Sequence, residues 1–240
     1  MGIQEAQNVA AARREETRCR AVRDAGNPKD MVDRQELYDA LYERHTKQVQ
    51  DRLDAAHVAI AGLGGLGSTI AVALTRIGVG HLHLVDFDRV DMSNLNRQQY
   101  FLRDLGRLKT EALQGNLAQI NPFIDVRIDS VAVDEHNVAS LFADDDIIAE
   151  AFDVPENKCI LVNGVLEHLP EAKLLSASGM AGFGSANSIV TRRVSEGFYF
   201  CGDGVTAPTP GNGLMAPRVG VVACHEANMI TRLILGQDEA

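Results

Sequence analysis

The sequence predicts an α/β fold: a Rossmann-like, mostly parallel sheet flanked by helices, with a C-terminal antiparallel extension and a closing helix. Two observations carry this prediction. From residue 57 onward, short apolar runs alternate with longer helical patterns, which is typical of parallel strands connected by helices. The first apolar run leads directly into the glycine loop Gly62-x-Gly64-x-x-Gly67, the position that such a loop takes in nucleotide-binding folds.

The elements of this core follow one another in a regular order. Short apolar runs predict strands at residues 58–61, 81–86, 123–129, 146–150 and 173–178. The segments between them predict helices at about residues 67–78, 106–120 and 155–168. Residues 188–202 alternate like an antiparallel hairpin, and the apolar pattern from Met215 onward predicts the closing helix, with Pro217 near its start.

The segment before residue 57 is predicted to be helical. Residues 1–30 are an extension, helical or flexible, whose sparse apolar positions would bury little. A lead-in helix is expected after the turn at residues 25–30, because its apolar and aromatic residues recur at helical spacing: Leu37, Tyr38, Leu41 and Tyr42. Residues 31–240 are then one domain, with a nucleotide-binding core at 57–180.

Composition excludes several classes of protein. The chain has 23 Lys and Arg residues against 33 Asp and Glu residues, and a formal net charge of −10 would repel a nucleic acid. No apolar run approaches the roughly 20 residues that cross a bilayer, so no membrane partner is expected. The four cysteines form no Cys-x-x-Cys pair, so we expect neither disulfides nor zinc, and a cytoplasmic location.

The glycine loop predicts a phosphate site. Glycines at residues 62, 64, 65 and 67 would allow a tight turn, bring backbone amides close to phosphate and let the helix pack on the strand. Asp86, at the end of the second strand, stands where a carboxylate accepts hydrogen bonds from ribose hydroxyls. The alternative is that the glycines only permit close packing and that Asp86 is an exposed strand end.

The segment after Asp86 separates a nicotinamide site from an ATP site. A triphosphate carries more charge than a diphosphate and needs cations and a metal ion. Arg97 and Lys109 would supply the cations, while further polar groups cluster around them: Asp88, Asp91, Asn94 and Gln98. Taken singly, Arg97 could instead pair with Asp86 or Asp88 on the surface, and Lys109 with Glu111 or water.

A further carboxylate follows the strand predicted at residues 146–150. Asp153 stands just before Pro155, so it is either the N-cap of the next helix or a group aimed at the cleft at the strand ends. A Mg²⁺ ion would favour the second role, because it binds one or two carboxylates together with phosphate oxygens. Asp144, Asp145 and Asp146 lie at the opposite end of the strand and are expected to be solvated.

The run "AGLGGLGSTIAVALTRIGVGHLHLVDFDRVDMSNLNRQQY", with "GRLKTEAL" and "INP" downstream, resembles the ThiF/MoeB/HesA family, the bacterial relatives of ubiquitin-activating enzymes. The resemblance covers about residues 44–237, and "DFDRVDMSNLNRQ" is its most specific part. The segments "EAFDVPENK" and "SASGMAGFGSAN" look most like ThiF-type adenylyltransferases for the sulfur carrier ThiS of thiamine thiazole synthesis.

The resemblance implies an ATP-dependent nucleotidyltransferase that adenylates a small ubiquitin-like sulfur carrier ending in Gly-Gly. It implies a homodimer, in which Arg44 or Lys47 of one subunit would reach the site of the other, and a carrier-binding crossover part at residues 181–240. By position, the glycine loop and Lys109 would bind phosphates, Asp86 the ribose and Asp153 the Mg²⁺ ion. Asn94 and Arg97 would also bind the phosphate chain, and Gln98 would line the same site.

The chain departs from many relatives in its cysteines. Two zinc-binding Cys-x-x-Cys pairs are missing, so ATP and Mg²⁺ are the expected cofactors. Some relatives use a thiol to capture the activated carrier, and Cys201 is the best-placed candidate, although Phe198, Tyr199 and Phe200 beside it favour a packing role. Cys159 and Cys224 fall within apolar helical patterns and are expected to be structural.

Several functions compete with this interpretation. Related adenylating enzymes serve a molybdopterin-type carrier or dehydrate a modified tRNA base, and the acidic composition disfavours the second. An oxidoreductase would use the same loop for NAD or FAD but leaves Asn94, Arg97 and Lys109 without a use. A non-catalytic carrier-binding protein would retain the fold without the phosphate and magnesium residues.

Overall fold

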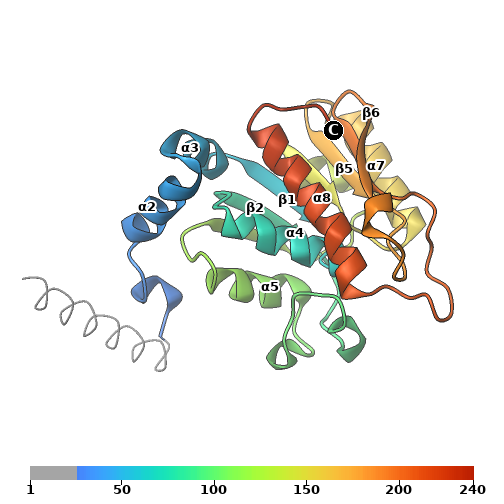
Figure 1. The fold of residues 1–240 in the computed structure, drawn as a ribbon, viewed down its shortest axis with the longest axis horizontal. Helices are drawn as coiled ribbons and strands as arrows, with labels where there is room; N and C mark the ends of the chain where they lie inside the picture. Colours follow the sequence, from blue (N-terminus) through green and yellow to red (C-terminus); the bar gives the residue numbers. More distant parts are fainter. Residues whose placement is uncertain (1–25) are drawn as a thin grey trace, which may run out of the picture.

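A seven-stranded sheet with helices on both faces organises residues 26–240, the part of the chain that this computed structural model describes (Figure 1). The strand order is β3-β2-β1-β4-β5-β7-β6, and only β6 runs antiparallel to its neighbour within this sheet. The strands are β1 (His57–Ala61), β2 (His81–Val85), β3 (Asp125–Asp129), β4 (Ile147–Glu150), β5 (Lys173–Ala177), β6 (Val190–Ser195) and β7 (Phe198–Gly202). The predicted fold class is confirmed; the predicted extension before residue 26 lies outside the described residues.

Two sets of helices cover the sheet. On one face lie α4 (Gly65–Arg76), α5 (Lys109–Ala118) and α8 (Ala216–Ile234), and on the other lie α6 (Val138–Leu141) and α7 (Pro155–His168). The first set packs on the sheet through residues such as Ile70, Leu113 and Val222, whereas the second does so through Phe142 and Leu161. These helices follow the predicted positions, except that α6 was not predicted. Four short 3-10 helices occur in the described part: η1 (Pro28–Asp30), η2 (Met92–Asn94), η3 (Leu102–Asp104) and η4 (Ala186–Ser188).

The lead-in segment forms two helices, where the sequence predicted one. They are α2 (Arg34–His45) and α3 (Lys47–Asp54), and Thr46 between them has a φ of 70°. A positive φ is incompatible with a helix interior, and the hydroxyl of Thr46 instead accepts a hydrogen bond from the backbone N–H of Val49. The second helix is tied to the amino ends of the strands, because the side chain of Gln50 donates to the carbonyl of Gly78.

The side chain of His83 on β2 contacts carboxylates from two other segments of the chain. Its Nε2 lies 2.9 Å from Asp129 on β3, and its Nδ1 lies 2.8 Å from Asp145, which precedes β4. Each ring nitrogen thus lies within hydrogen-bond distance of a different carboxylate. The side chain of Asp145 is only 6% exposed. The expectation of a solvated aspartate run was therefore wrong for Asp145, because His83 on β2 gives its buried carboxylate a partner.

Replacement of His83 by glutamine is expected to lower the free energy of unfolding by about 1–3 kcal/mol, because it takes the ring nitrogen away from the buried carboxylate of Asp145. Urea denaturation at neutral pH measures this loss. His81→Gln is the matched control, since His81 is 40% exposed in its pair with Asp125 and such a pair contributes about 0–1 kcal/mol. Equal losses in the two variants would contradict the interpretation.

Candidate nucleotide-binding site

The glycine loop lies between the carboxyl end of β1 and the first turn of α4. Gly62 has a φ of +93°, and a Cβ atom there would lie 2.9 Å from the backbone of Ala151 and from the ring of Phe152. A Cβ atom at Gly67 would lie 1.8 Å from the carbonyl oxygen of Gly62. Close packing therefore requires glycine at both positions, as the alternative interpretation of the loop predicted.

Gly64 has a different environment, which fits a ligand. It is the N-cap of α4 and provides no side-chain cap, so the first backbone N–H groups of the helix are available to an anion. A Cβ atom at Gly64 would meet only the amide of Gln98, at 3.8 Å. The Oε1 atom of Gln98 is buried and has no hydrogen-bond partner within residues 26–240. An unsatisfied amide beside a free helix N-terminus fits a polar ligand, such as a nucleotide, at this position.

The two glycines allow a matched test of the loop. Gly67→Ala is expected to lower the free energy of unfolding by about 3 kcal/mol, because the added methyl group overlaps the carbonyl of Gly62. Gly64→Ala is expected to change stability by less than about 0.5 kcal/mol and to weaken ATP binding about tenfold, since the methyl group enters the space facing Gln98. Thermal unfolding and calorimetric ATP titration measure the two effects, and equal ATP affinity for wild type and Gly64→Ala would contradict the assignment.

Asp86 braces the loop from the end of β2. Its Oδ2 accepts from the backbone N–H of Leu63 at 2.6 Å, and its Oδ1 accepts from that of Asp88 at 2.8 Å. Burial raises the pKa of Asp86, and the charge of Lys109 and the two backbone hydrogen bonds oppose the rise. The side chain is therefore not the exposed strand end of the alternative interpretation. It holds the loop through the backbone N–H of Leu63.

Lys109 is paired with the same carboxylates. It opens α5, its side chain is 8% exposed, and its Nζ lies 2.8 Å from Asp88 and 3.8 Å from Asp86. The suggested pairing with Glu111 does not occur. A buried ammonium group between two aspartates, directly behind the glycine loop, is a cation that a polyphosphate could also bind.

Arg97 lies along the other side of the loop. Carbon atoms of its side chain lie 3.3 and 3.5 Å from the position of a Cβ atom at Gly65, and its guanidinium donates to the carbonyl of Ser93 and to Oδ1 of Asn96. Within the described part of the chain it forms no ion pair, so the suggested pairing with Asp86 or Asp88 does not occur. Its charge is available to an anion.

Asn94 uses one of its two polar atoms in the local turn. Its Oδ1 accepts from the backbone N–H of Asp91 at 3.0 Å, while the Asp91 carboxylate accepts from the N–H of Ser93 at 2.9 Å. This reciprocal pair shapes η2, the 3-10 turn that leads to Arg97. The amide nitrogen of Asn94 has no partner among residues 26–240 and can donate to a ligand.

Asp153 lies in the connection from β4 to α7. The N-cap of α7 is Val154, so the alternative that Asp153 caps this helix was wrong. Asp153 is exposed, forms no ion pair in the described residues and follows Phe152, whose ring packs against Gly62. An exposed carboxylate is a ligand that Mg²⁺ takes together with phosphate oxygens, so Asp153 fits that ion.

Two residues of this region were missed by the sequence analysis. The hydroxyl of buried Tyr100 donates to the carbonyl of Leu63 at 2.8 Å and so fixes the loop from the side opposite Asp86. Burial raises its pKa. Glu150, fully buried at the end of β4, accepts from the backbone N–H of Phe152 at 2.8 Å. The sequence signal that could have indicated Tyr100 was its position two residues after Gln98. The signal for Glu150 was the presence of a carboxylate in an apolar strand.

The cysteines differ in their environments. Cys201 is fully buried, and burial, followed by the charge of Glu226, raises its pKa to about 12. The thiolate is the reactive form, so these properties favour the packing role. Cys159 and Cys224 are exposed, which corrects the expectation that they are structural: both lie on helices, but on sides that do not face the core.

Arg44 and Lys47 lie near the junction of α2 and α3, on the side of the amino ends of the strands. Lys47 pairs with Asp51 at 2.6 Å on the surface, and the hydrogen bond to Asp51 raises its pKa. The glycine loop lies at the opposite ends of the strands. A contribution of either cation to nucleotide binding therefore requires a second copy of the chain.

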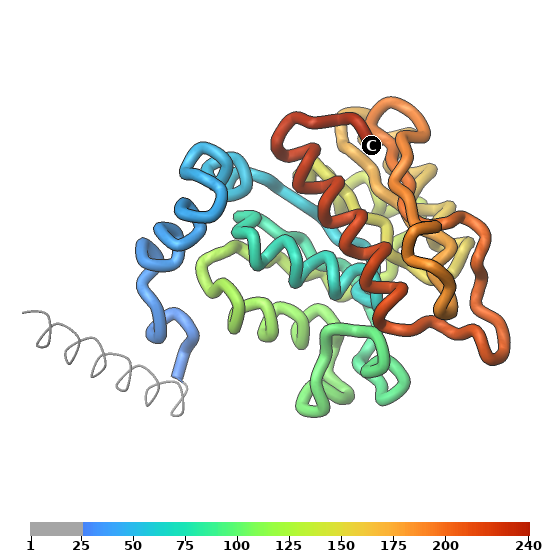
Figure 2. The backbone as a smooth tube through the Cα atoms, viewed as in Figure 1, coloured from blue at the N-terminus to red at the C-terminus, as the bar shows by residue number. Residues whose placement is uncertain are grey.

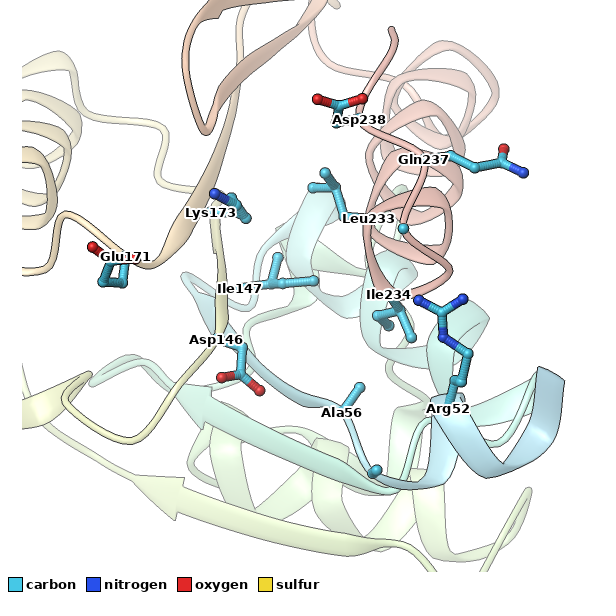
Figure 3. Close-up of a pocket in the computed structure, with 12 residues that line it drawn as sticks. Arg52, Ala56, Asp146, Ile147, Glu171, Lys173, Leu233, Ile234, Gln237 and Asp238 are labelled. Atoms are coloured by element: carbon cyan, nitrogen blue, oxygen red, sulfur yellow. The ribbon is translucent and has the colours of Figure 1, made fainter. Parts of the chain in front are cut away.

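A separate cavity of about 550 Å³ opens at that same amino end of the sheet (Figure 3). Ile147 and Lys173 line one side, and Leu233, Ile234 and Arg52 line the other. None of the residues predicted to bind the nucleotide lines it. The chemistry-bearing residues thus gather at the carboxyl ends of β1, β2 and β4, where open parallel sheets bind their ligands.

The fold and this site define an α/β nucleotide-binding protein whose glycine loop is flanked by two cations and several carboxylates. The chain belongs to the ThiF family: the family profile matches residues 38–240. No helix in residues 26–240 is both long and apolar enough to cross a membrane.

Curated relatives are similar over most of this chain. The adenylyltransferase and sulfurtransferase UBA4 of Candida glabrata is 32% identical over 195 residues, which are 78% of this chain and 44% of that protein. The chain therefore spans less than half the length of this relative. The molybdopterin-synthase adenylyltransferase of Escherichia coli is 29% identical over 216 residues, which are 84% of this chain and 85% of that protein.

Solved structures share the fold. The tRNA N6-threonylcarbamoyladenosine dehydratase of Escherichia coli, determined in complex with ATP, superposes with a TM-score of 0.74 at 21% identity, over 82% of this chain and 93% of that one. At this identity the likeness supports the fold alone.

Proposed function

We propose that this chain is an ATP-dependent nucleotidyltransferase that adenylates the C-terminal Gly-Gly carboxylate of a small ubiquitin-like sulfur carrier. One observation carries the proposal: the side chains of Arg97 and Gln98 and the segment leading to Asp153 contact the glycine loop, and Lys109 pairs with Asp86, which bonds to that loop. If the ligand were a dinucleotide cofactor, these charged side chains would have no evident function. The names of the relatives, which are adenylyltransferases, support the same chemistry.

The reaction joins two anions. An oxygen of the carrier carboxylate forms a bond to the α-phosphorus of ATP, the bond from that phosphorus to the bridging oxygen breaks, and pyrophosphate leaves with the electron pair. The products are an acyl-adenylate and pyrophosphate, and no proton must be removed from the nucleophile. Catalysis then requires alignment and neutralisation of charge rather than a general base.

The residues of this chain divide these tasks. The N–H groups at the start of α4, with Gly64 as the open position, would receive phosphate oxygens, and Asp86 would accept from the ribose. Arg97 and Lys109 would neutralise charge on the phosphates as pyrophosphate departs. Asp153 would hold Mg²⁺, which when bound polarises the phosphate oxygens.

The carrier of thiamine thiazole synthesis is the one we favour. The segments "EAFDVPENK" and "SASGMAGFGSAN" resemble ThiF-type enzymes for that carrier. A molybdopterin-type carrier is the alternative, supported by the name of the Escherichia coli relative. The net charge of −10 disfavours a tRNA substrate. We also infer a homodimer, because Arg44 and Lys47 lie away from the site of their own subunit.

Exchange of labelled pyrophosphate into ATP tests this function. Purified protein is incubated with Mg-ATP and, in parallel, with a thiazole-type carrier, a molybdopterin-type carrier, each carrier without its last glycine, or bulk tRNA. Exchange with one intact carrier and none with its truncated form is the expected result. Exchange that needs no carrier, or ATP cleavage stimulated by tRNA alone, would overturn the proposal.

A further inference from the structure

A buried ion pair lies directly beneath the proposed site. Glu150, the last residue of β4, is fully buried, and both of its carboxylate oxygens lie within 3.0 Å of Nζ of Lys158 on α7. The hydroxyl of Ser176 on β5 donates to the same carboxylate at 2.6 Å. Lys158 also donates to the carbonyl of Ala177 at 3.0 Å. The pair therefore ties the carboxyl ends of two strands to the first turns of α7.

This carboxylate also holds the backbone of the site. Oε1 of Glu150 accepts from the N–H of Phe152 at 2.8 Å, while the N–H of Ala151 donates to the carbonyl of Ala61 on β1 at 2.8 Å. These two residues are the ones that approach Gly62 so closely that only glycine fits there. The next residue is Asp153. One carboxylate thus fixes a turn that contacts the phosphate loop on one side and carries the magnesium candidate on the other.

A second buried carboxyl group provides a contrast. Glu226 on α8 is fully buried, and neither of its oxygens has a hydrogen-bond partner within residues 26–240. Burial, and then the charge of Glu150, raise its pKa well above the ordinary value. Burial therefore disfavours the charged form of Glu226. The two groups share a cluster, but only Glu150 bonds to the backbone of the site.

Stability alone does not account for the charge on Glu150. Burying an ion pair costs desolvation that its attraction roughly offsets, and apolar packing of the same volume would be as stable. What an apolar side chain could not do is accept the N–H of Phe152 while being held by a lysine and a serine from two other elements. The specific effect of the pair is therefore the conformation of residues 151–153.

We propose that Glu150, oriented by Lys158 and Ser176, is a positioning residue that sets Asp153 and the Gly62 turn for Mg-ATP. This inference rests on the proposed function. Glu150 does not touch the nucleotide itself; it acts through Phe152 and Asp153.

Calorimetric titration with ATP, with and without Mg²⁺ and without carrier, tests the inference independently of turnover. Wild type should bind ATP more tightly with Mg²⁺. In Glu150→Gln the gain in ATP affinity that Mg²⁺ gives should fall about tenfold, which is the usual effect of replacing a residue that orients a metal ligand. The affinity for ATP without Mg²⁺ should stay within about twofold of the wild-type value. Asp153→Asn should lose the same gain, and the double variant should lose no more than either single variant.

Glu226→Gln is the matched control, because it changes a buried carboxyl group of the same cluster that makes no hydrogen bond to the backbone of the site. It should leave the Mg²⁺ gain unchanged. If Glu150→Gln does not fold by circular dichroism, Lys158→Gln, which keeps donors near Glu150, is measured in its place with the same expectation.

An unchanged Mg²⁺ gain in the Glu150 or Lys158 variant, an equal loss in Glu226→Gln, or additive losses with Asp153→Asn would overturn the positioning role. Wild-type protein that binds no ATP would overturn the proposed function as well. That outcome is recognised without any variant, so the two failures are distinguishable.

Discussion

Replacement of Arg97 by alanine is expected to lower kcat/KM for pyrophosphate exchange by about 10²- to 10³-fold, the usual effect of removing one preorganised charge from a reacting group. The guanidinium lies beside the glycine loop and has no carboxylate partner in the described residues. The charge of Arg97 therefore stabilises no carboxylate of the fold, and the unfolding temperature of Arg97→Ala should equal that of the wild type. Steady-state exchange and thermal unfolding measure the two quantities.

Arg103→Ala is the matched control for Arg97. Arg103 lies a few residues downstream, where its guanidinium stacks at 4.6 Å on the ring of Phe101 and donates to Asn116. Its loss should change exchange by less than about twofold. Comparable losses in both variants would mean that the region responds to any lost charge, and the assignment of Arg97 would fail.

Replacement of Arg218 by alanine is expected to lower the free energy of unfolding by about 3–5 kcal/mol, because it breaks a buried ion pair and leaves a buried carboxylate behind. Arg218 is 5% exposed. Its guanidinium donates to Asp203 at 2.6 Å and to the carbonyls of Gly184 and Ser185 at 2.9 and 2.7 Å. It joins the start of α8 to the loops after β5 and β7, and the long loop before α8 runs along the outside of the molecule (Figure 2).

Denaturant titration of Arg218→Ala against Arg192→Ala measures the effect. Arg192 is an exposed arginine over the ring of Phe200, at 4.5 Å, and its loss should cost less than about 1 kcal/mol. A loss for Arg218 no larger than that for Arg192 would show that the loops keep their conformation without the buried pair.

The ion pair of Arg218 and Asp203 also predicts how the free energy of unfolding depends on pH. Burial opposes the charge of Asp203, but hydrogen bonds from Thr206, Val205 and Arg218 outweigh it and lower its pKa from 3.8 to about 2. A group whose pKa is lower in the folded state stabilises the fold above its unfolded pKa, and this contribution is lost as the pH falls toward 2. Asp203→Asn should flatten the decline in unfolding free energy between about pH 4 and pH 2.

Most of the fold could be predicted because strands and crossover helices repeat at the periods that burial imposes. β1, β2, β4 and β5 are rich in apolar residues and are buried at nearly every position, as strands covered on both faces should be. The break at Thr46 could not be predicted in this way, since a single φ of 70° leaves the helical periodicity of both flanks intact. The burial of Asp145 was missed because its partner, His83, is 62 residues away in the chain.

The candidate site was predictable to the extent that its charges are clustered in the sequence. Arg97, Gln98 and Lys109 follow the glycine loop within one segment, and the structure gathers them around it. Glu150 and Arg218 were not predictable, because their functions depend on partners from other elements. A buried carboxylate in an apolar strand and an arginine in the first turn of an apolar helix were the only signals, and neither identifies a partner.

The pairing of Lys109 with Asp88 and Asp86 has a consequence for selectivity. Because the ammonium group already has counter-ions, an incoming anion must exchange with Asp88 rather than fill an empty positive site. Under the proposed function, chloride or inorganic phosphate would gain little from such an exchange, because it would bring no ribose to Asp86 and no second phosphate to Arg97. Ordinary cellular anions would therefore compete weakly for this site, and a nucleotide would displace the aspartate only by binding at several points at once.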